Sequence, residues 1–325
     1  MTNLDLHRLG TTGPEVTSPG LGAMGLSGAY GPIDAGEGER VIHAYLDAGG
    51  RLLDTGDFYG AGHNEMLLGR ALRGRRDDVV LSVKFGALLV PGGFPHGVDA
   101  RPASVRNFLT YSLQRLGVDH VDVYRPARLD PSVPIEDTVG AIAELVEAGY
   151  VRHVGLSEVG ADTVRRAAAV APIADLQIEY SLLSRGIEDA ILPTCRELGI
   201  GITAYGVLSR GLIGGSGTVE GGRRLSPRFQ DGNREHNQAL VARLEATADE
   251  LGCSVAQLAQ AWVAAQGADI VPVIGARRVE QVTTMLAGVT LSPDDAARLS
   301  TLIPRDAAAG DRYPAAAMAD LDSER

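Results

Sequence analysis

The chain has 325 residues, a formal net charge of −11 and a hydrophobic content of 45%. This acidic balance argues against nucleic acid or an anionic membrane as the main partner, because both require a basic surface. The length suits either two ordinary domains or one α/β barrel of about 250 residues with insertions.

The two cysteines, Cys195 and Cys253, are too far apart in the sequence for a CxxC motif. We expect reduced packing residues, as in a cytosolic protein. The first residues, MTNLDLHRLG, contain no apolar signal core, and no run reaches the 18 or so apolar residues that a spanning helix needs. These features predict a soluble, cytoplasmic protein.

The chain begins with a predicted β-hairpin between Leu4 and Val16, with its turn at Gly10 to Gly13. The next residues, Gly20 to Gly25, match the dinucleotide-binding pattern G-x-G-x-x-G. That motif requires a strand before it and a helix opening within it. Here Ser18-Pro19 comes before the match and a Gly- and Pro-containing loop follows it, so we reject a doubly wound fold at this point.

From Glu37 onward, short β-branched runs alternate with amphipathic stretches. After a first short strand at PGLGAM, the expected strands are residues 51–55, 79–85, 120–126, 151–158, 175–181, 199–206 and 269–276. The expected helices include residues 102–116, 135–148, 161–171 and 187–198, with two extra helices late in the chain at 236–251 and 254–266.

Eight strands that alternate strictly with helices favour a closed parallel sheet, the (β/α)8 TIM barrel. No linker divides the chain, so residues 1–325 are interpreted as a single domain. A long connection follows the seventh strand, and loops of that length usually have a function. The Ala- and Asp-rich tail after Ala307 is compatible either with folding over the barrel mouth or with disorder.

The stretch LLDTGDFYG places Asp54 at the end of an apolar run and Tyr59 in the loop after it. A phenol with a pKa near ~10 is a poor acid or base at neutral pH unless a positive charge lies near it. The candidate cation is Lys84, at the end of the next strand. It is the only lysine in a chain with 29 arginines, and burial shifts the pKa of a lysine but leaves a guanidinium charged.

In a parallel barrel the site lies at the C-terminal ends of the strands. The residues at these ends are mostly polar, although a helix cap, a backbone hydrogen bond or rim packing would explain each of them singly. They are Asp54, Lys84, Ala127, Ser157 with Glu158, Gln177, Tyr205 and Gly275.

The sequence resembles the aldo-keto reductase superfamily along nearly its whole length. The similarity lies in DTGDFYGAGHNEMLLGRAL, VVLSVKFG, YSLQRLGVDHVDVY, GYVRHVGLSE, LQIEYSLLSR and VPVIGARRVEQV. The resemblance implies a (β/α)8 barrel that binds NADP(H) without a Rossmann domain and interconverts carbonyls and alcohols. It also implies that Tyr59 is the general acid, that Lys84 lowers the pKa of Tyr59 and that Asp54 holds Lys84.

The resemblance further implies a set of cofactor-binding residues. Ser157 and Gln177 would bind the nicotinamide amide, Tyr205 would stack on its ring, and the loop with Leu208 and Arg210 would contact the pyrophosphate. Gly275, Arg277, Arg278 and Gln281 would complete the site at the last strand. A helix N-terminus beside guanidinium groups suits a phosphate, so Arg277 or Arg278 is predicted to bind the 2′-phosphate of NADP(H). Two solvated arginines are the plainer alternative.

The sequence departs from the family pattern at the end of strand four. The family has a catalytic histidine there, and the aligned residue is Ala127, which cannot donate a hydrogen bond or titrate. Arg125 would face the same side of the strand, towards the barrel lumen, and a compensating role for it is a hypothesis. Cofactor binding is also expected to be altered by Gly206-Val207 and Thr284-Met285, which replace Ser-Pro and Glu-Asn of many relatives.

Three functions therefore stay open. An NADPH-dependent reductase of an aldehyde or ketone comes first, and an NADPH-binding sensor or partner protein with little activity comes second. An unrelated barrel lyase or isomerase would need a metal cluster or a phosphate-only site. His63 and Glu65 are too few to bind a metal and are expected to shape the loop after Tyr59. The substrate and the oligomeric state, including a homo-oligomer, are not readable from the sequence.

Overall fold

The computed structural model describes residues 4, 6–91, 96–214, 219 and 221–324. In this part of the chain, eight parallel strands close into a barrel. In order around the barrel they are β10 (Ile270–Gly275), β3 (Gly20–Gly22), β4 (Leu52–Gly56), β5 (Val80–Phe85), β6 (Val121–Pro126), β7 (Val151–Ser157), β8 (Ile173–Glu179) and β9 (Gly201–Tyr205). The predicted (β/α)8 fold is confirmed.

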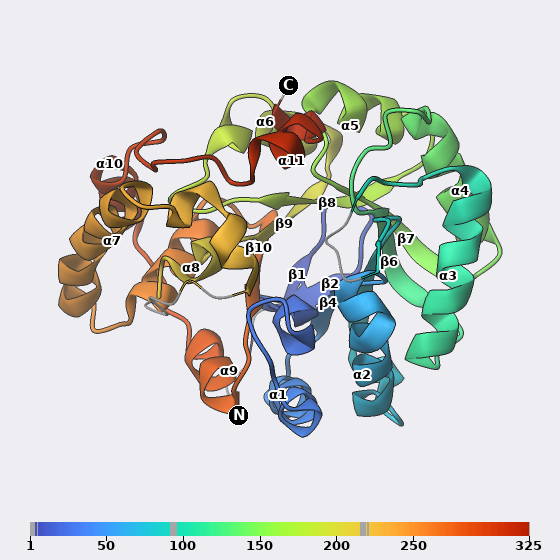
Figure 1. Cartoon of the computed structure of the whole chain (residues 1–325), viewed down its shortest axis with the longest axis horizontal. Coiled ribbons are helices and arrows are strands. Elements are labelled where there is room, and N and C mark those ends of the chain that lie inside the picture. The colour runs from blue at the N-terminus through green and yellow to red at the C-terminus, as the bar shows by residue number, and fades with distance from the viewer. Residues whose placement is uncertain (1–3, 5, 92–95, 215–218, 220, 325) are drawn as a thin grey trace.

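Helices surround this barrel, as Figure 1 shows for the arc from α1 to α5. They are α1 (Ala35–Asp47), α2 (His63–Ala71), α3 (Pro102–Leu116), α4 (Ile135–Glu147), α5 (Ala161–Ala168), α6 (Ile191–Leu198), α7 (Asn233–Glu250), α8 (Val255–Ala265), α9 (Val279–Leu286), α10 (Pro293–Leu302) and α11 (Ala315–Ala319). Most bounds lie within three residues of the expected ones. Helix α6 begins four residues late, because a 3-10 turn at Gly186–Glu188 precedes it.

The G-x-G-x-x-G match contributes a strand and a 3-10 turn to the barrel. Gly20 and Gly22 lie in β3, and residues Ala23–Ser27 form the turn after it. A Cβ atom on Gly20 would lie 2.7 Å from the side chain of Leu52 on the neighbouring strand. This glycine therefore allows two strands to pack closely, which confirms the rejection of a dinucleotide-binding βαβ unit here.

The predicted hairpin closes the bottom of the barrel. Strands β1 (Leu6–Arg8) and β2 (Glu15–Thr17) pair antiparallel. Leu9 and Val16 pack with Leu52, Val271 and Val273 in a small core separate from the main core between strands and helices. With the N-terminal ends of the strands covered in this way, the C-terminal ends are left to form the site.

The tail folds over the barrel, which the sequence left undecided. The red segment in Figure 1 runs from α10 to α11 and ends beside α5 and α6. Arg305 forms an ion pair with Asp189 at 2.7 Å, and the Asp322 carboxylate accepts the backbone N–H of Gly160 at 2.8 Å. Within the described part of the chain, no helix combines the length and apolarity needed to cross a membrane.

Candidate active site

A buried ion pair joins the ends of β4 and β5. The Nζ atom of Lys84 lies 2.6 Å from Oδ2 of Asp54. Only 4% of Lys84 and 5% of Asp54 are exposed. A pair this deep needs further hydrogen bonds to offset its desolvation. Oδ1 of Asp54 provides them, because it accepts the Ser82 hydroxyl at 3.0 Å and the Gln177 amide at 2.8 Å.

Gln177 therefore reaches Asp54 from β8. Its Nε2 donates to Asp54, which leaves the amide oxygen of Gln177 for another partner. Ser157 stands opposite Gln177 in the β7–β8 register. The hydroxyl of Ser157 is buried and has no hydrogen-bond partner among the described residues. Buried polar atoms are nearly always bonded, so this hydroxyl has unused hydrogen-bonding capacity.

Tyr59 lies at the start of the 3-10 turn Tyr59–Gly62, directly after β4. Gly60, Ala61 and Gly62 have positive φ angles, and this left-handed run turns the chain sharply behind the ring. The ammonium of Lys84 lies 5.1 Å from the ring centroid of Tyr59. The three residues predicted to act together are thus brought together.

The electrostatics at Tyr59 differ from the expected effect of Lys84. Burial raises the pKa of the Tyr59 phenol well above its usual range, and the charge of Asp54 raises it further, while Arg128 acts in the opposite direction. Burial also lowers the pKa of Lys84, against the charge of Asp54. Tyr59 is therefore protonated at neutral pH, as a proton donor must be.

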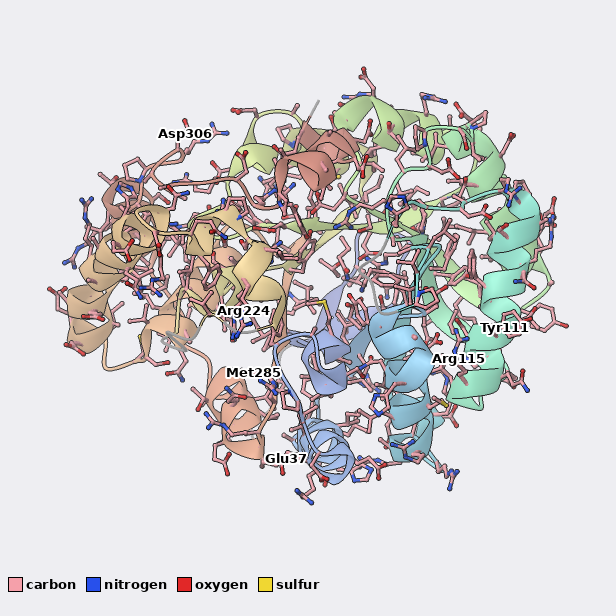
Figure 2. All side chains as sticks on the ribbon, in the orientation of Figure 1. Glu37, Tyr111, Arg115, Arg224, Met285 and Asp306 are labelled. Atoms are coloured by element: carbon pink, nitrogen blue, oxygen red, sulfur yellow. The ribbon has the colours of Figure 1, made fainter. Side chains whose placement is uncertain are left out.

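The loop after Tyr59 is held by polar contacts from α2. Nδ1 of His63 lies 2.9 Å from the Ser27 hydroxyl. The buried Glu65 carboxylate accepts a hydrogen bond from Nε of Arg115 at 2.5 Å. The side chain of Arg115 lies between α2 and α3 in Figure 2. His63 and Glu65 shape the loop, as expected.

Strand β9 ends at Tyr205, whose hydroxyl has two partners. It donates to Oε1 of Glu158 at 2.7 Å and lies 2.8 Å from the hydroxyl of Tyr313 in the tail. Glu158 is fully buried and adopts a φ of 53°, unusual for a residue other than glycine. Two of its partners, Arg312 and Ser323, belong to the tail. Glu158 thus joins the tail to the end of β7.

The tail residues Arg312 and Tyr313 were not among the predicted site residues. The Arg-Tyr dipeptide in an Ala- and Asp-rich segment was a weak signal, because a contact across 154 residues leaves no local pattern. Burial alone would raise the pKa of Glu158, but the charges of Arg312 and Arg128 and its hydrogen bonds lower it to about 2. Glu158 is therefore a carboxylate at neutral pH, and it forms an ion pair with the guanidinium of Arg312.

The loop after β9 contains Leu208 and Arg210 next to the tail. Ser209 and Arg210 both have positive φ angles. The Arg210 guanidinium lies 4.3 Å from the ring centroid of Tyr313 and donates to the Ser226 hydroxyl at 3.2 Å. One of its terminal nitrogens is buried without a hydrogen-bond partner among the described residues.

The predicted phosphate-binding residues follow β10, and the two arginines differ. The Arg277 guanidinium donates to the backbone carbonyls of Tyr30, Gly31 and Pro32 at 3.0, 3.0 and 2.6 Å. Arg278 is exposed at the N-cap of α9. The side chain of Gln281 accepts the backbone N–H groups of both arginines. Gly275, before them, is exposed at the end of β10.

Strand β6 places Arg125 inside the barrel. This guanidinium is fully buried and lies 2.9 Å from Asp175, with Thr203 and Ser82 also within hydrogen-bond distance. It faces the lumen, as the alternation predicted, and its partners are strand residues below the mouth. Ala127 is 2% exposed at the end of the strand.

The fold is a (β/α)8 barrel, a class of protein in which enzymes have their active sites at the C-terminal face of the strands. Residues 20–304 match the family model for the Aldo/keto reductase family. The chain is 42% identical over 316 residues to the protein named Probable aldo-keto reductase 1 of Glycine max, covering 94% of this chain and 91% of that protein. The chain therefore belongs to the aldo/keto reductase family, whose members act on small-molecule carbonyl compounds.

Solved structures give the same result. A glycerol dehydrogenase from Gluconobacter oxydans superposes with a TM-score of 0.82 at 30% identity, covering 93% of this chain and 96% of that chain. An aldo/keto reductase from Klebsiella pneumoniae in complex with NADP and acetate has a TM-score of 0.75 at 26% identity, covering 95% of this chain and 98% of that one.

Proposed function

We propose that this protein is an NADP(H)-dependent reductase of aldehydes or ketones, with Tyr59 as the proton donor. The observation that carries the proposal is the buried Asp54–Lys84 ion pair beside the Tyr59 ring, with Nζ and Oδ2 2.6 Å apart. A lysine and an aspartate are costly to bury together. Their position beside a protonated phenol supports a catalytic role for this ion pair.

In this mechanism the side chains transfer and stabilise one proton. The bound nicotinamide would supply a hydride to the carbonyl carbon. As negative charge develops on the carbonyl oxygen, Tyr59 donates its hydroxyl proton there, and the product alcohol forms. Lys84 stabilises the phenolate that is left on Tyr59, and Asp54 holds the ammonium in place.

Polar atoms with unused hydrogen-bonding capacity support the cofactor assignment. The buried Ser157 hydroxyl and the amide oxygen of Gln177, which the bond to Asp54 does not use, would bind the nicotinamide amide, which offers both a donor and an acceptor. The Arg210 guanidinium would bind the pyrophosphate, because one of its terminal nitrogens has no hydrogen bond and only an ion pair with Glu179 at 3.7 Å. Tyr205 would contact the nicotinamide ring, with Leu208 and Gly275 lining the path of the cofactor.

The 2′-phosphate is assigned to Arg278. Its exposed side chain begins a helix, and Gln281 orders the backbone there. Both terminal nitrogens of Arg277 donate to backbone carbonyls, and its Nε atom is buried, so its guanidinium faces the Tyr30 loop. Of the two arginines considered from the sequence, Arg278 is therefore the one proposed to favour NADP(H) over NAD(H).

One observation favours a second function, an NADPH-binding sensor or partner with little activity. Ala127 occupies the position that the resemblance assigns to a catalytic histidine, and its side chain has no hydrogen-bond donor. A missing donor at a developing oxyanion costs about 2.7–4 kcal/mol of transition-state stabilisation. The Asp54, Tyr59 and Lys84 arrangement opposes this alternative, because a sensor does not need a proton donor.

The test is NADPH oxidation against a panel of aldehydes, ketones and quinones, with NADPH affinity measured by fluorescence. We expect Tyr59→Phe to lower kcat by about 10²-fold or more, as for the loss of a general acid, while the Kd for NADPH changes less than threefold. The control is Tyr111→Phe, since Tyr111 points outward from α3 in Figure 2 and is 51% exposed. Tight NADPH binding without turnover on any compound would favour the sensor.

A further inference from the structure

Arg128 is a guanidinium at the barrel mouth that lacks an anionic partner. One of its terminal nitrogens donates to the backbone carbonyl of Ala127 at 2.6 Å, and the other to the Tyr313 hydroxyl at 3.3 Å. Both acceptors are uncharged. No described carboxylate lies within ion-pair distance of this half-buried side chain, and the charge of Glu158 acts on it only from a greater distance.

Other buried arginines of this barrel are paired. Arg125 lies 2.9 Å from Asp175, Arg312 lies 2.9 Å from Glu158, and Arg228 lies 3.4 Å from Glu179. Burying a charge is costly unless an opposite charge and hydrogen bonds compensate it. Arg128 thus differs from these three buried arginines, each of which has a carboxylate partner.

Arg128 shares the mouth with the proposed proton donor. The backbone N–H of Ala127 donates to the backbone carbonyl of Phe85 at 2.8 Å. The backbone N–H of Asp57 donates to the backbone carbonyl of Lys84 at 2.9 Å. The loops after β6 and β4 therefore both rest on the end of β5. The charge of Arg128 also acts on both catalytic candidates. Burial raises the pKa of Tyr59, and the charge of Arg128 acts against this rise. Burial is the largest cause of the lowered pKa of Lys84, and the charge of Arg128 lowers it further.

Several guanidinium groups besides Arg128 lie near the mouth, although the chain has a net charge of −11. Arg210 and Arg228 share the carboxylate of Glu179, and Arg312 pairs with Glu158, Glu179 and Glu324. An anionic group that entered the mouth beside Arg128 would be attracted by its guanidinium.

We propose that Arg128 recognises a carboxylate on the substrate, so that the site prefers carbonyl compounds that carry an acidic group, such as oxo acids and carboxylated aldehydes. This inference rests on the proposed reductase function. A guanidinium binds a carboxylate through two parallel hydrogen bonds, which fixes orientation as well as charge. A neutral substrate would leave Arg128 unpaired, and sites of this kind reject ligands that lack the matching group.

The test compares 4-carboxybenzaldehyde with 4-methylbenzaldehyde, which have similar shape and differ in charge. We expect the wild-type protein with NADPH to favour the carboxylated aldehyde at least tenfold in kcat/KM. Arg128→Met should remove this preference, so that the ratio of kcat/KM for the two aldehydes falls to about one, while Arg128→Lys should retain part of it. Arg243→Met, which removes an exposed arginine of α7, is the matched control for net charge and should behave as wild type.

A binding measurement keeps the inference testable without turnover. Calorimetric titration of the NADPH-loaded protein should show that benzoate binds at least tenfold more tightly than benzamide, and that Arg128→Met loses this difference. Thermal melting checks that each variant is folded, with Arg128→Gln as a second neutral variant.

The outcomes separate the two proposals. Equal reduction of both aldehydes by the wild-type protein would overturn the carboxylate assignment and leave the reductase function intact. No reduction of any aldehyde would count against the reductase function, and the benzoate titration would then decide the role of Arg128. Tighter binding of inorganic phosphate than of benzoate would also overturn the carboxylate assignment.

Discussion

At the scale of single residues, the polar positions of the barrel have unequal roles. Asp54 accepts hydrogen bonds from Lys84, Ser82 and Gln177, so that both of its oxygens are used. Arg125 is fully buried and pairs with Asp175, but its Nε atom has no hydrogen-bond partner among the described residues. Ser82 connects the two sets, because its hydroxyl accepts from Arg125 and donates to Asp54. A compensating role for Arg125 stays a hypothesis.

Asp57, between Asp54 and Tyr59 in the sequence, has an unusual protonation state. Burial and then the charge of Glu65 raise the pKa of its carboxyl to about 7. One of its oxygens is buried without a partner among the described residues. Because the folded-state pKa is raised above the unfolded value of about 3.9, the free energy of unfolding falls as pH rises from about 4 through 7.

We therefore expect Asp57→Asn to stabilise the protein increasingly with pH. The gain in free energy of unfolding should be about 1 kcal/mol near pH 5 and a few kcal/mol at pH 8, on the order of 1.4 kcal/mol per pKa unit. Urea denaturation at the two pH values measures it. Asp306→Asn, at an exposed position labelled in Figure 2, is the control and should show no such trend. A gain that is equal at both pH values would contradict this account.

At the scale of elements, the segment between β10 and α9 separates two tasks. Arg277 ties this segment to the Tyr30 loop through three backbone carbonyls, and Arg278 is exposed at the start of the helix. Adjacent residues of the same type thus have different surroundings, a difference that sequence reasoning did not resolve.

The single variants at these positions should differ. Arg278→Ala should weaken NADPH binding about tenfold or more, as for the loss of a charge-assisted hydrogen bond of about 1.5–3 kcal/mol, with little change for NADH or in melting temperature. Arg277→Ala should lower the melting temperature and affect both cofactors alike. Titration with both cofactors and thermal melting measure these effects. A double variant that kept its preference for NADPH would refute the assignment of the 2′-phosphate to this segment.

At the scale of the whole molecule, the tail completes the mouth. Arg312 binds the buried Glu158, and Tyr313 lies against Tyr205 and Arg210. Contacts from residues near the C-terminal end of the chain thus close the mouth of the barrel. The tail is part of the structure that surrounds the proposed site.

Removal of the tail contact should affect stability in a pH-dependent way. Arg312→Met leaves Glu158 buried without its main cation, so we expect a loss of about 3–5 kcal/mol in the free energy of unfolding at pH 7. The pKa of Glu158 is lowered to about 2 in the folded protein. Its stabilising contribution is therefore full above the unfolded pKa of about 4.3 and is lost as pH falls towards 2.

The wild-type protein should accordingly lose stability between about pH 4.3 and 2 more steeply than Arg312→Met, as measured by denaturant unfolding across this range. Arg305→Met, which removes a more exposed ion pair of the same segment, is the control and should cost less than about 1 kcal/mol. Parallel pH profiles for wild type and Arg312→Met would rule out the linkage between Arg312 and Glu158.

Much of the architecture follows from local pattern. The alternation of β-branched runs with amphipathic stretches predicted each barrel strand, and α3 has the predicted bounds 102–116. The sole lysine and the polar strand ends indicated where Asp54 and Lys84 would meet, whereas the hydrogen bond from Gln177 to Asp54 was not predicted. These inferences succeed because strand ends in a parallel barrel converge whatever connects them.

The sequence by itself determined the barrel and the grouping of Asp54, Tyr59 and Lys84, since both depend on periodicity and on the order of strands. Only the tertiary structure showed the contacts of Arg128, Glu158, Arg312 and Tyr313. These residues meet across 154 or more positions of the chain, and whether a charge has a partner depends on three-dimensional distance. A pattern read along the chain contains no information about that distance.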